Sequence, residues 1–269
     1  MDKGLDPVSD RTPNTGTWPS RQTVFKPWTG RQIAQVSAWD AAQPYSLLWA
    51  LIMIDLSVWD LILPVGTPAQ EVVANKLTGF TNPYFQNTAN GLVLWAPVTG
   101  AHSGSSHFPR SELREVNKSG SQRNWKYNSG TNVISGKVAV TQVPSEGKVV
   151  VAQIHAKDAD SPLLKVQYRF VKGSGNVDIT WRAKPGDDKS PIVYTFKNVP
   201  LGQPFTYKVE MANTGMVTAV INGVATQRQL DSKWKPYSFF FKAGNYTLDH
   251  SGYATEGGRV TYYELQTKH

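Results

Sequence analysis

From about residue 56 onward the chain is a succession of short runs in which apolar and polar residues alternate. The runs are rich in β-branched and aromatic residues, and Gly, Pro, Asn, Asp and Ser separate them. Successive side chains of a strand point to opposite faces, so this pattern is typical of half-buried strands. Many short strands with turn signals between them predict an all-β sandwich or jelly roll. The predicted strands cover residues 58–65, 91–98, 111–116, 132–143, 148–157, 163–172, 177–184, 192–199, 205–212, 216–223, 237–246 and 258–267.

Two tight turns and one aperiodic segment complete the outline. The sequences at 172–175 (KGSG) and 222–223 (NG) predict β-hairpins. Residues 1–45 carry several prolines and little periodicity, yet they also contain aromatic residues, which are rare in solvated linkers. We therefore expect an N-terminal extension or arm over 1–45, with a short helix around 32–42, and a β-domain over 46–269.

Charge and composition narrow the possible functions. The 269 residues carry a formal net charge of +8 and include no cysteine, which excludes disulfides, zinc-thiolate sites and cysteine nucleophiles. Asp55 and Asp60 interrupt the most apolar stretch, so no membrane span is expected, and the first residues do not read as a signal peptide. The positive charge suits a polyanionic partner, which composition alone leaves open between nucleic acid, anionic lipid and acidic polysaccharide, or it serves solubility.

Period-2 geometry groups the candidate chemistry on three strands. In the first, Arg110, Glu112 and Arg114 share one face, which must be wet or bound to something charged because burying such a line is costly. The simpler alternative is a solvated face whose glutamate pairs with its neighbours.

The other two strands carry further polar faces. In 148–157, Gln153, His155 and Lys157 share a face, whereas Val150, Ala152 and Ile154 share the apolar one. In the last run, one face is expected to hold Phe240, Lys242, Gly244, Tyr246 and Leu248. The sequence alone does not place these strands side by side.

In this order and spacing, the three blocks resemble a known family. Residues 110–114 (RSELR), 153–155 (QIH) and 242–246 (KAGNY) are similar to the signature blocks of alginate lyases of polysaccharide lyase family 7, and the likeness runs from about residue 50 to the C-terminus. It implies a concanavalin-like β-jelly roll with a substrate cleft across its concave sheet. It also implies endolytic β-elimination on an anionic polysaccharide of mannuronate and guluronate.

The resemblance also implies roles for individual residues. Arg110 and Gln153, helped by His155, would neutralise the substrate carboxylate, and Tyr246 would be the catalytic acid and often the base. Hydrogen-bond donors aimed at developing charge stabilise the transition state, and a guanidinium forks well onto a carboxylate. His155 is the alternative base for one of the two C5 epimers. The residues expected to bind the substrate are Arg114, Glu112, Lys242, Lys157 and Arg182.

Some points stay open at this stage. Phe240 and Leu248 stand where the family often has tyrosine and glutamine, which leaves the exact polymer uncertain between alginate and another polyuronate such as glucuronan. The QIH block is associated with guluronate-containing or mixed substrates. A non-catalytic polysaccharide-binding sandwich is disfavoured by His155 and Tyr246, and no nucleic-acid-binding motif is present. We expect no cofactor, no metal, no membrane partner, a monomer, and a secreted or periplasmic location.

Overall fold

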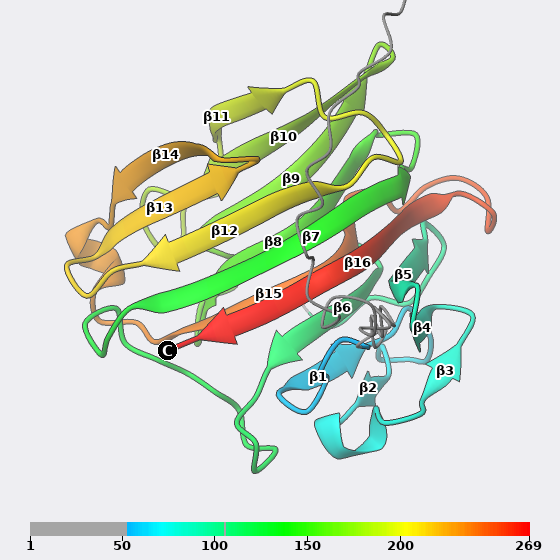
Figure 1. Ribbon diagram of the computed structural model, residues 1–269, viewed down its shortest axis with the longest axis horizontal. Helices are drawn as coiled ribbons and strands as arrows, with labels where there is room; N and C mark the ends of the chain where they lie inside the picture. Colours follow the sequence, from blue (N-terminus) through cyan, green and yellow to red (C-terminus); the bar gives the residue numbers. More distant parts are fainter. Residues whose placement is uncertain (1–52, 105) are drawn as a thin grey trace, which may run out of the picture. The chain divides into compact units, whose positions relative to one another are not determined.

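The computed structural model describes residues 53–104 and 106–269, which form two antiparallel β-sheets packed on one another (Figure 1). The expected arm over 1–45 and the helix around 32–42 lie outside the described residues. Two short 3-10 turns, η1 (Ala74–Lys76) and η2 (Ser232–Trp234), interrupt the strands, and this part of the chain has no helix that is long and apolar enough to cross a bilayer. The all-β jelly-roll prediction is confirmed.

The sheet that carries the polar blocks is called here the cleft sheet. Its strands lie in the order β11-β10-β9-β8-β15-β6-β1-β2, so strands far apart in the sequence become neighbours. The bounds are β11 (Ile192–Lys197), β10 (Ser174–Trp181), β9 (Leu164–Val171), β8 (Lys148–Ala156), β15 (Phe239–Thr247), β6 (Arg110–Glu115), β1 (Trp59–Ile62) and β2 (Glu71–Val72).

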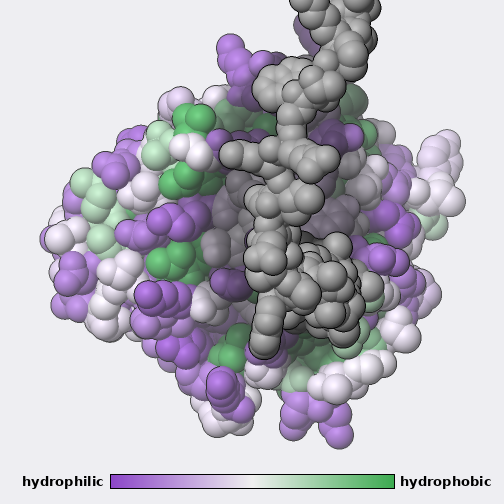
Figure 2. All heavy atoms as spheres, viewed as in Figure 1, coloured by the Kyte–Doolittle hydropathy of each residue, from purple (hydrophilic) through white to green (hydrophobic). Residues whose placement is uncertain are grey.

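The second sheet, called the back sheet, has the order β14-β13-β12-β7-β16-β5-β4-β3. In Figure 2 the visible part of its outer face carries hydrophilic and hydrophobic side chains intermixed. Its strands are β14 (Val224–Gln229), β13 (Met216–Ile221), β12 (Phe205–Met211), β7 (Asn132–Gln142), β16 (Gly257–Lys268), β5 (Gly91–Pro97), β4 (Phe85–Thr88) and β3 (Thr81–Asn82).

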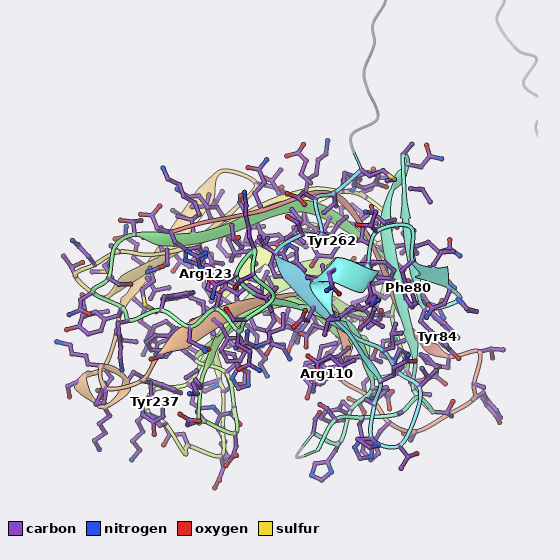
Figure 3. The ribbon with its side chains drawn as sticks, turned by 90° about the horizontal axis from the view of Figure 1, so that it is seen from below. Phe80, Tyr84, Arg110, Arg123, Tyr237 and Tyr262 are labelled. Carbon is purple, nitrogen blue, oxygen red and sulfur yellow. The ribbon has the colours of Figure 1, made fainter. Side chains whose placement is uncertain are left out.

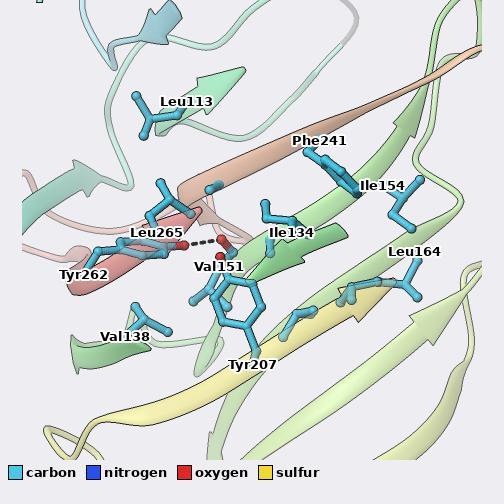
Figure 4. Close-up of a cluster of buried hydrophobic side chains, with 14 of the residues drawn as sticks. Leu113, Ile134, Val138, Val151, Ile154, Leu164, Tyr207, Phe241, Tyr262 and Leu265 are labelled. Atoms are coloured by element: carbon cyan, nitrogen blue, oxygen red, sulfur yellow. Dashed lines mark hydrogen bonds between the residues drawn. The ribbon is translucent and has the colours of Figure 1, made fainter. Parts of the chain in front are cut away.

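The core lies between the two sheets and contains the inward residues of both. Leu113, Ile154 and Phe241 come from the cleft sheet, while Ile134 and Tyr262 come from the back sheet (Figure 4). Burying one such large apolar side chain stabilises the fold by about 1.5–3 kcal/mol. The apolar residues whose alternation predicts the strands are therefore also the ones whose burial holds the two sheets together.

Both predicted hairpins are present. Lys172 and Gly173 have φ values of 52° and 76°, and Asn222 and Gly223 have 48° and 82°. Two successive positive φ angles are what a type I′ turn requires, and its twist matches that of the flanking strands. These turns set the registers of β9 with β10 and of β13 with β14.

An irregularity at the centre of the cleft sheet corrects one sequence expectation. The register of β8 with β9 shifts between Val150 and Ala152, which inserts one residue into β8. Val149, Val151 and Ala152 belong to the core cluster, but Val150 does not. Val150 pairs with Tyr246, so it faces away from Ala152, contrary to the simple period-2 prediction.

A tyrosine of the back sheet holds this irregularity in place. The Tyr262 hydroxyl on β16 accepts a hydrogen bond from the Gly244 amide at 3.0 Å. It also donates one to the Val151 carbonyl (Figure 4). Gly244 has a φ of 143°, and a Cβ there would lie 2.7 Å from the Ser111 carbonyl oxygen. Only glycine fits this close approach of β15 to β6.

Candidate active site

Strand order brings the three polar faces together. β6, β15 and β8 are adjacent, and the register sets Tyr246 opposite Arg110 and Lys242 between Arg114 and Gln153. Directly opposed residues on one sheet face have Cβ atoms about 4.5–5.5 Å apart. The sequence alone did not place these three strands side by side; the strand order of the sheet does.

These faces line a cavity of about 530 Å³ that crosses the strands of the cleft sheet. Loop residues from two segments also line it: Ser103, Ser106, His107 and Phe108 from the first, and 159–162 from the second. In Figure 3 Arg110 lies at the hollow below the sheet, and Tyr237 lies in the loops on the other side. The strand residues along the cavity are Ile62, Glu71, Arg110, Arg114, Gln153, His155, Lys165, Phe240, Lys242 and Tyr246.

Glu112 is the centre of a buried hydrogen-bonded group. Its Oε2 pairs with Arg110 Nη1 at 3.0 Å and with Lys242 Nζ at 2.7 Å, and its Oε1 accepts from the Gln153 amide. The residue is 1% exposed and does not line the cavity. Glu112, expected to bind substrate, instead holds three cleft residues from beneath, because a buried carboxylate must be paired.

The charges of this group shift one another. Burial would raise the pKa of Glu112, but Lys242 and Arg110 outweigh it and hold that pKa below its ordinary value. Burial lowers the pKa of Lys242 to about 8, with Glu112 opposing the shift. The line of Arg110, Glu112 and Arg114 is therefore buried and paired with its neighbours instead of being open to solvent.

His155 is a neutral imidazole with one nitrogen committed. Burial, followed by the charge of Lys242, lowers its pKa to about 4. Nδ1 lies 2.9 Å from the Ala156 carbonyl oxygen, which can only accept, so Nδ1 carries the proton. The lone pair of the neutral ring is therefore on Nε2.

Tyr246 is held by a residue that the motif analysis did not single out. Its hydroxyl lies 3.2 Å from Ser106 Oγ, and Ser106 Oγ also accepts from Arg110 Nη2 at 2.5 Å. The Arg110 guanidinium lies 3.9 Å from the centre of the Tyr246 ring. The available signal for Ser106 was its place in the polar loop just before Arg110.

Comparison with known proteins assigns this arrangement to a family. The family model described as alginate lyase matches residues 54–269, which include every residue of the site. This chain belongs to the alginate lyase family. It is a polysaccharide lyase, as the sequence blocks predict, and a solved relative is a named member of polysaccharide lyase family 7.

Three relatives give the extent of the likeness. A crystal structure of an alginate lyase from Pseudomonas aeruginosa is 38% identical, covers 80% of this chain and 99% of its own, and has a TM-score of 0.77. The family 7 alginate lyase A1-II' is 30% identical over 80% of this chain and 96% of its own, with a TM-score of 0.72. An alginate lyase from Klebsiella pneumoniae is 24% identical over 80% of this chain and 89% of its own. A variant of A1-II' was solved in complex with the substrate GGMG.

In this lyase, an aromatic ring separates two polar cleft residues. Phe240 stacks on His155 with ring centres 5.1 Å apart, and the Arg114 guanidinium lies 4.2 Å from the centre of the same ring. Arg114 also donates to Asn124 Oδ1 at 2.9 Å. The Phe240 ring thus fixes the plane of the imidazole, while Arg114 stays at the cavity wall.

Of the two remaining residues expected to bind substrate, Arg182 lies at the cavity and Lys157 does not. Arg182 lines the cavity and is 6% exposed. Lys157 is exposed beyond the end of β8 and is not among the cavity residues, because the chain turns away after Ala156. Lys165 of β9, which sequence reasoning missed, lines the cavity opposite Gln153. The described residues contain no cluster of three or more His, Cys, Asp or Glu that suits a metal ion.

Proposed function

We propose that this lyase cleaves alginate within the polymer by β-elimination and leaves 4,5-unsaturated uronate ends. The observation that carries the proposal is one cavity holding a neutral histidine, a tyrosine hydroxyl, an arginine and an amide. A uronate needs a base for its C5 proton, an acid for O4 and donors for its carboxylate. The cavity supplies all three kinds of group.

Carboxylate neutralisation falls to Arg110 and Gln153. Removing the C5 proton places negative charge on the adjacent carboxylate, and donors already aimed there stabilise that charge. Arg110 Nη1 and one Gln153 N–H are committed to Glu112, so the substrate takes the other donors. We infer that a carboxylate oxygen takes the place of Ser106 Oγ at Arg110 Nη2.

The proton transfers balance within the site. The C5 proton passes to His155 Nε2 for one epimer; for the other it passes to the Tyr246 oxygen, after the hydroxyl has given its own proton to solvent. The C5–H electron pair forms the C4–C5 double bond, and the C4–O4 bond breaks. Tyr246 supplies the proton to the departing O4. A base must approach its proton within about 3 Å, and His155 is already neutral at pH 7 because its pKa is about 4.

Three finer points belong to the same proposal. A cavity that crosses strands from β1 to β9 suits a long chain and therefore internal cleavage. The QIH block favours guluronate-containing or mixed blocks. A polymeric substrate outside the cell fits a secreted or periplasmic enzyme.

Ultraviolet absorbance of the conjugated unsaturated product tests the reaction. Alginate blocks and glucuronan are each incubated with the full chain in the presence of a chelator. We expect absorbance to rise on alginate, mixed oligomer sizes from the first minutes, and no reaction with Tyr246→Phe at unchanged melting temperature. Absence of product on every polyuronate contradicts the lyase proposal, and early release of a single small product contradicts internal cleavage.

A second substrate is favoured by one observation. Phe240 and Leu248 both line the cavity, where they offer no hydrogen bond to a sugar hydroxyl. Another polyuronate such as glucuronan is the alternative, and faster cleavage of glucuronan than of any alginate block would establish it.

A further inference from the structure

Lys165 and Arg182 line the cavity and form no ion pair within the described part of the chain. Arg182 as a residue is 6% exposed, and its buried Nε has no hydrogen-bond partner among the described residues. Lys165 is half-buried, and the ion pairs found in the described residues include neither side chain. Burying a charge without a partner is costly, so this pair is poised to take an anion.

The fold holds the backbone of this pair firmly. The Arg182 amide donates to the Leu163 carbonyl at 2.8 Å, and the Arg182 carbonyl accepts from Trp234 Nε1 at 3.0 Å. Lys165 is paired with Gln153 on one side and with Thr180 on the other. Both side chains line the same cavity as the catalytic group, so an anion bound there belongs to the same ligand.

The pair is too far from Arg110 to share one carboxylate with it. In the strand order, β9 and β10 are three and four places from β6. At ~4.8 Å per strand, these separations along the sheet are roughly 14 and 19 Å. Any carboxylate that reaches Lys165 and Arg182 is therefore on a different sugar unit from the one that Arg110 neutralises.

Nearby acids limit what else could bind. Asp187 and Asp188 raise the pKa of Arg182, against the larger effect of burial, and Asp160 lies at the cavity wall. None of them forms an ion pair with Arg182 within 4 Å in the described structure. Their charges oppose a polyanion with closely packed phosphates more than a single carboxylate.

We propose that Lys165 and Arg182 form a second carboxylate subsite, which holds a uronate unit away from the scissile bond and thereby strengthens the binding of oligomers long enough to reach it. This inference rests on the proposed function, since it assumes a polyuronate in the cleft. The subsite acts in binding, and Arg110, Gln153, His155 and Tyr246 perform the chemistry.

Substrates of graded length test the subsite. Lys165→Gln and Arg182→Gln are compared with Lys137→Gln, a half-buried lysine on the back sheet. For long oligomers, KM is expected to rise about 10-fold or more in each cleft variant, the loss typical of one charge-assisted hydrogen bond, with kcat nearly unchanged. For the shortest cleaved oligomer, which does not span both sites, the variants and the wild type should agree.

Equilibrium binding separates this proposal from the lyase proposal. Oligomers are titrated into the Tyr246→Phe protein with and without each cleft substitution, and melting temperatures check folding. One outcome is that the wild type cleaves no polymer, while the substitutions still weaken binding of the long oligomers and not of the short ones. That outcome supports the subsite and contradicts the lyase reaction. Equal affinities for all lengths in all variants, or a kcat loss without a KM change, overturn the subsite.

Discussion

Replacing Glu112 by glutamine removes the buried negative charge that Arg110, Lys242 and Gln153 contact. Two cations contact this carboxylate, Lys242 Nζ at 2.7 Å and Arg110 Nη1 at 3.0 Å. Removing one partner of a buried ion pair costs about 3–5 kcal/mol. Glutamine keeps the volume of the side chain and one acceptor oxygen. Lys242, whose pKa is already about 8, can release its proton. We therefore expect a loss of stability near the lower limit of this range.

The loss should be visible both in stability and in rate. A loss of about 3 kcal/mol in a domain of this size lowers Tm by about 6–12 °C. Because Arg110 and Gln153 lose their common anchor, kcat should fall by about 100-fold, the cost of misplacing catalytic groups by an ångström or so, while KM changes little. Thermal unfolding and initial rates on alginate measure the two effects.

The control is Glu210→Gln, on the back sheet. Glu210 pairs with Lys208 at 3.1 Å, but both side chains are partly exposed, and such surface pairs contribute about 0–1 kcal/mol. Full kcat in Glu112→Gln would refute the positioning role. A Tm equal to that of the control would refute the claim that these buried pairs stabilise the fold.

Further predictions concern His155, Ser106 and Tyr262. The acid limb of kcat/KM should lie near pH 4, since the pKa of His155 is lowered from 6.5 to about 4, and a limb near 6.5 would contradict a buried neutral base. The unfolded chain binds more protons than the native protein between these values, so His155 lowers stability as the pH falls from 6.5 to 4, which urea unfolding at several pH values measures. Ser106→Ala should reduce kcat about 2- to 10-fold through loss of the neutral hydrogen bond to Tyr246, and an unchanged rate would argue against a role for that contact. Tyr262→Phe leaves the Gly244 amide and Val151 carbonyl unpaired and should cost about 1–3 kcal/mol by denaturant unfolding, whereas the same change at exposed Tyr263 should cost nothing measurable.

Local patterns predict the longer strands because alternation reports directly on a buried face. The unpredicted strands are β2 and β3, which have two residues each, β4, and β14, whose residues are almost all exposed. Neither two residues nor an exposed strand produces an alternating pattern. Their pairing depends on neighbours that tertiary structure supplies.

The candidate site was predictable as a set of residues but not as an arrangement. The resemblance named Arg110, Gln153, His155 and Tyr246, and strand order places all of them at one cavity. The central position of Glu112 was missed, because period 2 states which face a side chain takes and not whether neighbours cover it. Lys165 and Ser106 were missed because neither belongs to a signature block.

The inward side chain next to Tyr246 has a consequence for how this enzyme can change. Asn245 is fully buried and donates across the core to carbonyl oxygens of Gly258 and Leu94 in the back sheet. Strand β15, which carries Tyr246, is thus fastened on its core side, away from the cavity. A Cβ at Gly258 would lie 2.6 Å from Asn245 Oδ1, so a substitution at this position of the back sheet would disturb the strand that carries Tyr246 without touching the cleft.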